Sequence, residues 1–288
     1  KKWAKNTQRN HIIVEHNDNS GSVDEQAYIK KLTSDVRVVS IVHTSPVTGM
    51  TVDLEKITKE VRNVTPDCII IVDGIQHSSH GAIDVQKYDI DGYVVSPYKM
   101  FSRHGYGVAW ASERLCSLNK EQLADGPFQN WELGTRDAGS YATFSDVVDY
   151  LDWLGSNFTE SENTRERLEA SSIAIKSHEQ ELVDLVINGA EDIVGLRNNK
   201  KIRIIGNSAS TSREGVVSFF HKNKPSRIIV EELRQRKIRV HIRKDDHYCG
   251  NILRPLNQKD CIRFSICHYN SKAEVVEFMK AINEISTN

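Results

Sequence analysis

The sequence has no apolar run long enough to cross a bilayer, and its first residues lack the apolar core of a signal peptide. Its formal net charge is only -1 over 288 residues, so it has no broad basic field for nucleic acid or an anionic membrane. The five cysteines are odd in number and scattered, which does not predict a disulfide framework. We therefore expect a reducing compartment, with the cytoplasm as the default and an organelle as an open alternative, and no nucleic-acid or membrane partner.

Several short functional motifs are also absent. The sequence contains no CxxC pair, HExxH helix, P-loop or GxGxxG turn. His77, His80 and His104 lie near one another in the chain, but their spacing does not match a known zinc pattern. We therefore expect no metal site.

The first half of the chain alternates short apolar runs with polar segments. A helical segment at 53–61 separates the first two runs, which predicts a crossover helix and an α/β fold. The runs do not alternate with polar residues, which favours strands buried on both faces of a mainly parallel sheet. The predicted strands are 38–42, 68–72, 93–95 and 108–110.

The pattern changes after a polar stretch at 156–163. We expect a large domain over 1–158 and a small α+β domain over 159–288. Ser271 and Glu274 have the spacing of a capping box, which predicts the start of the last helix. Other elements expected around and beyond the polar stretch are helices near 144–154, from 165 and at 226–233, and strands at 202–205, 216–220, 238–242 and 262–266.

Polar residues follow the predicted strands of the first half. Because ligands of open α/β sheets bind beyond the carboxyl ends of the strands, His43, Asp73 and Ser96 are expected at one edge. A pyridoxal-phosphate site needs a lysine amine for the cofactor aldehyde, a carboxylate for the pyridine nitrogen, and hydroxyl groups for the phosphate. Asp73, Ser96 and the nearby Lys99 supply these groups.

Four segments in this order carry a family resemblance. They read V-D-G-I-Q at 72–76, S-P-Y-K at 96–99, W-E-L-G-T at 131–135, and I-R-F-S-I-C-H-Y-N-S at 262–271. Together they resemble the class V aminotransferase group, and within it the cysteine-desulfurase-like proteins. The resemblance covers nearly the whole chain. It implies fold type I of the pyridoxal-phosphate enzymes: a mainly parallel large domain, here incomplete at its N-terminus, and a small α+β domain.

The resemblance also implies residue roles. Lys99 would bind the cofactor and carry the proton of the substrate α-carbon, and Asp73 would pair with the pyridine nitrogen. Arg263 would hold the substrate carboxylate. The remaining contacts would be made by Gln76 to the phenolic oxygen, by Ser96 and Tyr98 to the phosphate, and by Thr135 to the phosphate of the neighbouring subunit. A homodimer with shared sites follows from the role of Thr135.

Three features depart from the family pattern. The chain starts at a point that matches the inside of the large domain, which leaves out the family's phosphate-binding turn and ring-stacking residue. Pro46 stands where the family has asparagine, so one side-chain contact is lost. Arg103 stands where relatives have small residues, and would narrow or recharge the entrance.

Cys249 decides between two patterns of the family. The segment 247–250 reads H-Y-C-G, which is similar both to the H-H-C-A of true desulfurases and to a H-Y-Y-A form without the sulfur-carrying cysteine. We expect an enzyme acting on a small amino acid, a cysteine-desulfurase-like lyase or sulfurtransferase with Lys99 and Cys249 as catalytic residues. The alternatives are a catalytically silent scaffold or truncated homologue, and an aminotransferase or epimerase.

Overall fold

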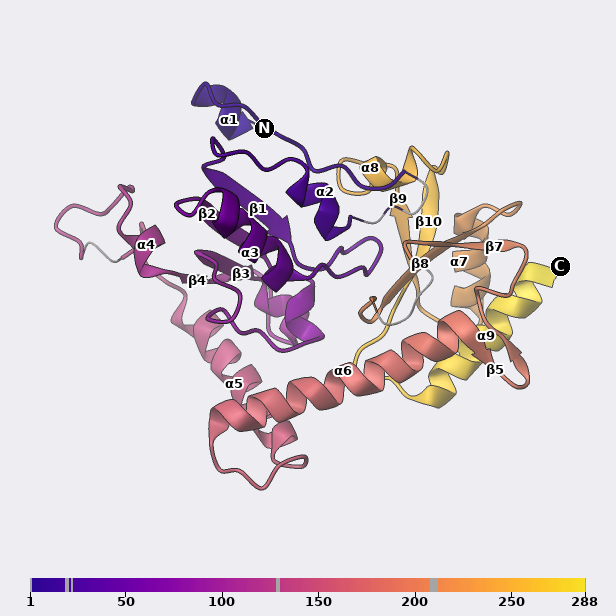
Figure 1. Cartoon of the computed structure of the whole chain (residues 1–288). Coiled ribbons are helices and arrows are strands. Elements are labelled where there is room, and N and C mark those ends of the chain that lie inside the picture. The colour runs from indigo at the N-terminus through magenta and orange to yellow at the C-terminus, as the bar shows by residue number, and fades with distance from the viewer. Residues whose placement is uncertain (1, 19–20, 22, 128–129, 208–211, 288) are drawn as a thin grey trace.

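The computed structural model describes residues 2–18, 21, 23–127, 130–207 and 212–287. Two four-stranded sheets lie side by side, and one long helix, α6 (Thr164–Asn188), runs below both of them (Figure 1). Two short helices, α1 (Lys2–Asn6) and α2 (Glu25–Ile29), precede the first sheet. No helix among the described residues has the length and apolar character needed to span a membrane.

The first sheet has the strand order β1-β2-β3-β4. Its first three strands run parallel and the fourth runs antiparallel to β3, so the sheet is mainly parallel as predicted. Their bounds are Val38–Val42, Ile69–Asp73, Gly92–Val95 and Val108–Ala111. The crossover helix α3 (Leu54–Val64) joins β1 to β2, and it begins where the Asp53 carboxylate accepts a bond from the backbone N–H of Lys56. A short helix, α4 (Glu113–Cys116), follows β4.

Burial differs between the two faces of this sheet. Helix α3 covers one face, where its apolar residues share a core with Val39, Ile41, Ile70 and Val72. On the other face of β1, Val38 and Val42 are 51% and 45% exposed. The prediction of strands buried on both faces was therefore wrong for β1, because no described layer covers its second face. An apolar run alone does not report which faces of a strand are covered.

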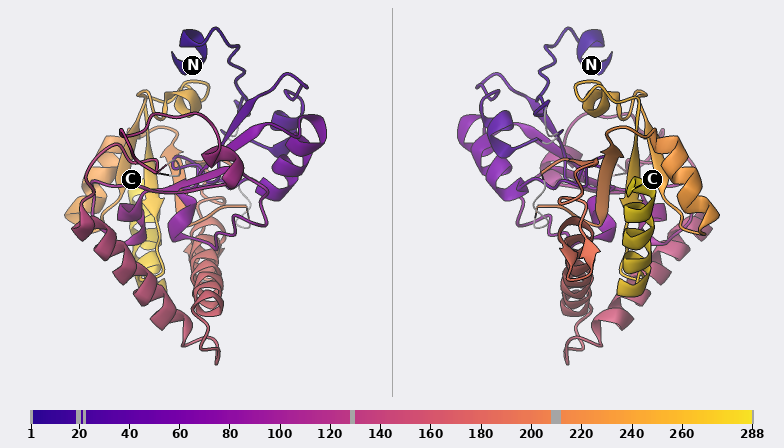
Figure 2. Two further views of the ribbon diagram at one scale, coloured as in Figure 1. Left: turned by 90° about the vertical axis from the view of Figure 1, so that its left-hand side faces the viewer. Right: turned by 90° about the vertical axis from the view of Figure 1, so that its right-hand side faces the viewer.

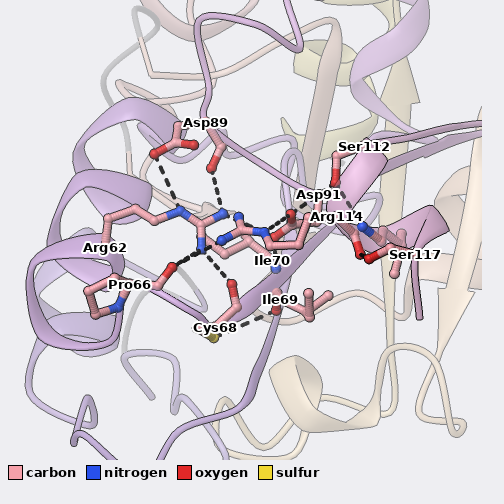
Figure 3. A network of polar contacts seen from close by, with 11 residues as sticks. Arg62, Pro66, Cys68, Ile69, Ile70, Asp89, Asp91, Ser112, Arg114 and Ser117 are labelled. Carbon is pink, nitrogen blue, oxygen red and sulfur yellow. Dashed lines mark hydrogen bonds and ion pairs between the residues drawn. The ribbon is translucent and has the colours of Figure 1, made fainter. Parts of the chain in front are cut away.

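A buried carboxylate holds the far ends of β2 and β3 together (Figure 3). Asp91, just before β3, accepts the backbone N–H of Ile70 at 2.9 Å and the hydroxyl of Ser112 at 3.0 Å. It also pairs with Arg62 of α3 at 3.0 Å and with Arg114 of α4 at 2.8 Å. The Asp91 carboxylate thereby fixes β2 and β3 relative to each other. The site lies at the opposite, carboxyl-terminal ends of these strands.

The helices α5 (Ala138–Gly155) and α6 pack as a hairpin whose turn spans 156–163 (Figure 2). The predicted domain boundary at 158 lies in this turn. After α6 come a short ribbon, β5 (Gly189–Ala190) with β6 (Ile193–Val194), and the second sheet. That sheet is antiparallel in the order β7-β8-β10-β9, and α6, α7 and α9 contribute to its core. Its elements are β7 (Ile202–Ile205), β8 (Val216–His221), α7 (Ser226–Gln235), β9 (His241–Lys244), α8 (Gly250–Leu253), β10 (Asp260–Ser265) and α9 (Lys272–Thr287).

Two sequence predictions meet different outcomes in this second sheet. The capping box is confirmed: Glu274 accepts the backbone N–H of Ser271 at 2.7 Å, and Ser271 accepts that of Glu274. The strand predicted at 238–242 begins three residues later, at His241. Lys237 adopts a left-handed conformation with φ 62°, and Ile238 still bonds back to α7, so Ile238 packs on the core without joining the sheet.

The segment after β1 is fastened to the second sheet. Arg213 is buried and donates to the carbonyls of Thr48 and Ile205, and the Ser218 hydroxyl donates to the carbonyl of Val47. These bonds hold the carboxyl end of β1 against the second sheet. The strand ends of the first sheet therefore open directly onto β10, which carries Arg263.

Candidate active site

Lys99 and Gln76 meet at the carboxyl end of the first sheet. Lys99 belongs to the short helix η2 (Pro97–Met100), which follows β3, and Gln76 lies just before η1 (His77–Ser79), which follows β2. Lys99 Nζ donates a hydrogen bond to Gln76 Oε1 at 2.7 Å. Both residues come from adjacent parallel strands, so the edge predicted from the sequence brings them together.

Asp73 is the last residue of β2 and lies at the same edge. One carboxylate oxygen, Oδ1, accepts the backbone N–H of Ile75 at 3.0 Å, which fixes the side chain at the start of the turn to Gln76. The residue is half-buried. The negative charge of Asp73 raises the pKa of Lys99, whereas burial and two arginines lower it.

The Lys99 amine is tuned towards its neutral form. Burial lowers the pKa of Lys99, and the positive charges of Arg263 and Arg243 lower it further, while Asp73 acts in the opposite direction. A neutral amine is the form that bonds to an aldehyde. The surroundings of Lys99 therefore favour nucleophilic chemistry over the role of a solvated surface lysine.

Arg263 reaches the site from the second sheet. Its Nη1 donates to the carbonyl of Pro46 at 3.0 Å, and its Nε is buried without a hydrogen-bond partner among the described residues. Burial and the neighbouring Arg243 lower the pKa of Arg263. Guanidinium N–H groups without partners form the planar fork that suits a carboxylate. Pro46, the departure from the family pattern, thus contributes its backbone carbonyl to positioning this arginine.

The predicted phosphate contacts lie on both sides of Lys99 in the chain. Ser96 directly follows β3, and its hydroxyl makes no capping bond to η2, which leaves it available for a ligand. Tyr98 is exposed and stacks on His104 at a centroid distance of 4.3 Å. Thr135 is exposed in the segment before α5, and among the described residues no hydrogen bond joins it to Lys99. The structure therefore joins Asp73, Gln76, Lys99 and Arg263 in one site and leaves Thr135 apart.

Cys249 lies close to the arginines but is covered. It caps α8, is 1% exposed, and accepts a hydrogen bond from Arg243 Nε at 3.1 Å. Burial raises the pKa of Cys249 more than Arg243 lowers it. In this conformation Cys249 is a protonated, inaccessible thiol. Arg103, the third departure, pairs with Asp137 at 3.1 Å on the surface.

Two buried histidine–glutamate pairs behind the site were not predicted. His80 Nδ1 lies 2.7 Å from Glu179 Oε2 of α6, and His77 Nδ1 lies 2.5 Å from Glu214 Oε1 before β8. The partners lie 99 and 137 residues apart in sequence, and a single sequence gives no signal for contacts of this range. With both histidines paired in this way, the described residues contain no cluster of three or more potential metal ligands.

The residues present fit a pyridoxal-phosphate group. The site offers a lysine of lowered pKa, a strand-end carboxylate, an unengaged serine hydroxyl and a buried arginine nitrogen without a partner. Gln76 Nε2 uses one of its two N–H groups towards His80, so the other remains for a ligand oxygen. Groups suited to the aldehyde, the pyridine nitrogen and the phosphate are therefore present at the carboxyl edge of the first sheet, and Arg263 faces them from the second sheet.

Known proteins are similar to this chain in sequence. The chain is 26% identical to an aminotransferase-like protein of Gibberella zeae, FGM3, over 93% of this chain and 63% of that protein. It is 22% identical to a probable cysteine desulfurase of Pseudomonas putida, over 95% of this chain and 65% of that protein. The chain thus spans slightly under two thirds of the length of these curated relatives.

Solved structures agree on the fold. A cysteine desulfurase from Thermococcus onnurineus superposes with a TM-score of 0.79 at 20% identity, covering 99% of this chain and 68% of that one. This likeness confirms the predicted fold of the pyridoxal-phosphate enzymes of type I. The model of the family described as aminotransferase class-V matches residues 2–278. The chain therefore belongs to the aminotransferase class-V family.

Proposed function

We propose that this chain carries the site of a pyridoxal-phosphate-dependent enzyme that acts on a small amino acid, as a cysteine-desulfurase-like C–S lyase or sulfurtransferase. The observation that carries the proposal is the Lys99 amine, half-buried, of lowered pKa, and held 2.7 Å from Gln76 beside Asp73. The relatives described as cysteine desulfurases support the choice of reaction.

The side chains divide the work of binding. When bound, pyridoxal phosphate supplies an electron sink for the electrons of the bond broken at the substrate. Asp73 would hold a proton at the pyridine nitrogen, and Gln76 would donate its free N–H to the phenolic oxygen. Ser96 and Tyr98 would contact the phosphate. Arg263 would bind the substrate carboxylate with its open N–H groups, which fixes the α-carbon in front of Lys99.

Lys99 would also move a proton. Its neutral amine would accept the proton of the substrate α-carbon and would return it later. The lowered pKa of Lys99 raises the neutral fraction of the amine, which is the form that this step needs. Arg263 and Arg243 maintain that fraction because their charges disfavour the ammonium form.

Cys249 would accept the sulfur in a desulfurase reaction. Its thiolate would attack the substrate sulfur, so that an S–S bond forms as the C–S bond breaks, and the carbon left behind gains a proton to give alanine. The covered position of Cys249 requires the loop around 245–250 to move before this attack. Arg243, now bonded to the thiol, would stabilise the thiolate.

We also propose a homodimer in which Thr135 completes the phosphate site of the partner. The exposed position of Thr135, apart from Lys99, supports a contact outside its own subunit. All five cysteines are free thiols, which supports a reducing compartment such as the cytoplasm.

The test is the visible absorption spectrum of the purified chain with added pyridoxal phosphate, beside Lys99→Ala. We expect a long-wavelength band of the lysine-bound cofactor that survives desalting, is lost in the variant, and changes when L-cysteine is added. Release of alanine and sulfide would then establish the reaction. A chain without the band would contradict the proposal and favour a catalytically silent scaffold. Binding without alanine release would favour another reaction, such as transamination.

A further inference from the structure

A series of three hydrogen bonds starts at the Lys99 amine and ends at a buried carboxylate of α6. Lys99 Nζ donates to Gln76 Oε1 at 2.7 Å, Gln76 Nε2 lies 3.1 Å from His80 Nε2, and His80 Nδ1 lies 2.7 Å from Glu179 Oε2. Gln76, His80 and Glu179 are all buried, and Glu179 is only 2% exposed. From Gln76 onward, the series therefore runs into the buried interior behind the site, through His80 to Glu179.

The direction of each bond follows from the one before it. A carboxamide oxygen only accepts, so the Lys99 amine is the donor to Gln76 Oε1. The Gln76 amide nitrogen only donates, so His80 Nε2 must be the acceptor and carries no proton. The single proton of a neutral His80 is then on Nδ1, where the Glu179 carboxylate accepts it. This arrangement of protons gives each of the three hydrogen bonds one donor and one acceptor.

The opposite orientation of Gln76 shows what Glu179 contributes. A proton on His80 Nε2 would face the amide N–H groups, and Gln76 would turn its oxygen towards the histidine. The amide N–H groups would then point at Lys99, where they repel an ammonium. Glu179 disfavours this arrangement, because it holds the proton on the far nitrogen of the ring.

We propose that Glu179 and His80 are positioning residues of the site: by keeping the proton on His80 Nδ1, they hold the Gln76 carboxamide oxygen towards the Lys99 amine. The proposal rests on the proposed function only for the role of Lys99 as the cofactor-binding amine. Glu179 lies on α6, the helix that connects the two sheets. The orientation of Gln76 at the site therefore depends on the position of that helix.

Other charged groups face the same series from neighbouring elements. They act through space on Lys99, His80 or Glu179 but make no hydrogen bond within the series: Asp73 at the end of β2, His178 on α6, Glu214 before β8, Arg243 on β9 and Arg263 on β10. Substitution of Glu179 therefore needs a control that removes a similar charge at a similar depth.

The chain supplies that control in the second pair. Glu214 is bonded to His77, lies in the same buried region, and also acts on His80 through its charge. His77 uses its other ring nitrogen towards the carbonyl of Ala82, so it does not contact Gln76. Loss of Glu214 removes a buried histidine–glutamate bond without breaking the series to Lys99.

The experiment measures the reactivity of Lys99 in the chain without cofactor. Trace acetylation with acetic anhydride, followed by mass spectrometry of the Lys99 peptide, reports the neutral fraction of the amine at each pH. In Glu179→Leu we expect about tenfold faster labelling below the pKa of Lys99, because a charge-assisted hydrogen bond is replaced by repulsion. Glu179→Gln keeps an acceptor oxygen for His80, so we expect labelling close to that of the parent chain, as in Glu214→Leu.

Nitrogen NMR of ¹⁵N-histidine-labelled chain tests the tautomer directly. We expect the proton of His80 on Nδ1 in the parent, in Glu179→Gln and in Glu214→Leu, and on Nε2 in Glu179→Leu. A proton on Nε2 in the parent would overturn the proposal. So would equal changes in Lys99 labelling in Glu179→Leu and Glu214→Leu, because they would show a general effect of buried charge.

A second variant covers the case in which Glu179→Leu does not fold, as judged by circular dichroism and thermal unfolding. His80→Leu removes the acceptor of Gln76, and we expect the same faster labelling of Lys99. Where Glu179→Leu does fold, its effect and that of His80→Leu should not add in the double variant, because the residues act in series; additive effects would overturn the proposal. Neither the labelling of Lys99 nor the tautomer of His80 requires cofactor. Failure to bind pyridoxal phosphate would therefore contradict the proposed function, and both measurements could still be interpreted.

Discussion

At the scale of single residues, the reactivity of the Lys99 amine depends on its burial and on charged side chains from the second sheet. The sequence indicated Lys99 and Asp73 because an amine and a carboxylate are groups that the chemistry needs, and the family resemblance added Arg263. What lowers the pKa of Lys99 is burial together with Arg263 and Arg243, which come from a distant sheet. Single-sequence patterns do not report such neighbours, so the sequence identified the groups without their tuning.

Cys249 shows the same gap and leads to a prediction. Because its thiol is covered and its pKa is raised, we expect iodoacetamide to alkylate Cys249 at least about tenfold more slowly than the half-buried Cys116 at neutral pH. Peptide mass spectrometry over a time course gives both rates in one sample. Equal rates would show that the loop around 245–250 opens readily, and that the covered state is a minor obstacle to sulfur transfer.

At the scale of helices and strands, the sequence predicted which elements form better than where they begin or which of their faces are covered. Both β1 and α3 form where the apolar patterns place them. The predicted strand at 238–242 moved to His241–Lys244, because α7 continues into a left-handed turn at Lys237 that the apolar pattern does not reveal. That shift places Arg243 in the ladder opposite Cys261, and so beside Cys249 and Arg263.

The Asp91 carboxylate joins β2, β3, α3 and α4, and it supports a prediction about the stability of the protein. Its side chain is 0% exposed and accepts bonds from Arg62, Arg114, Ser112 and the backbone of Ile70. We expect Asp91→Asn to lower the free energy of unfolding by about 3–5 kcal/mol, because it leaves buried donors without a charged acceptor. Urea unfolding followed by circular dichroism measures the difference.

The pH dependence of that difference has a defined sign. Burial alone would raise the pKa of Asp91, but the hydrogen bonds from Ile70, Arg114 and Arg62 outweigh it, so its pKa is lowered. The contribution of Asp91 to stability is therefore fully present above the pKa of an ordinary aspartate, which is about 4. It is lost as the pH falls below that value and through the lowered pKa of the folded state. The exposed Asp89, which also pairs with Arg62, is the control; Asp89→Asn should cost less than about 1 kcal/mol. Equal losses in both variants would contradict a special role of Asp91.

At the scale of the whole molecule, the order of motifs predicted the fold, while the contacts between its parts were found only in the structure. Strand ends of a parallel sheet converge by geometry, which is why His43, Asp73 and Ser96 could be placed at one edge from the sequence. The bonds from His80 to Glu179 and from Arg263 to Pro46 join residues 99 and 217 positions apart. Such pairs depend on how α6 and the second sheet dock, which no local pattern encodes.

A shared site between two copies of the chain predicts rescue by mixing. In a mixed dimer of Lys99→Ala and Thr135→Val, one site loses both residues, and the other keeps Lys99 from one subunit and Thr135 from its partner. Random reassortment makes half of the dimers mixed, so about a quarter of the sites should be intact. We therefore expect the mixture, after mild unfolding and refolding, to retain more pyridoxal phosphate through desalting than the average of the two variants alone.

The control for this experiment mixes Lys99→Ala with the double variant Lys99→Ala, Thr135→Val. No site of that mixture contains Lys99, so a gain there would report only improved folding. Thr135 is exposed and lies apart from its own Lys99, which is the arrangement that a contact across two subunits requires. If the first mixture shows no gain although size-exclusion chromatography shows dimers, Thr135 serves its own subunit or none. The phosphate contacts proposed for Ser96 and Tyr98 would then stand without one from Thr135 of the partner.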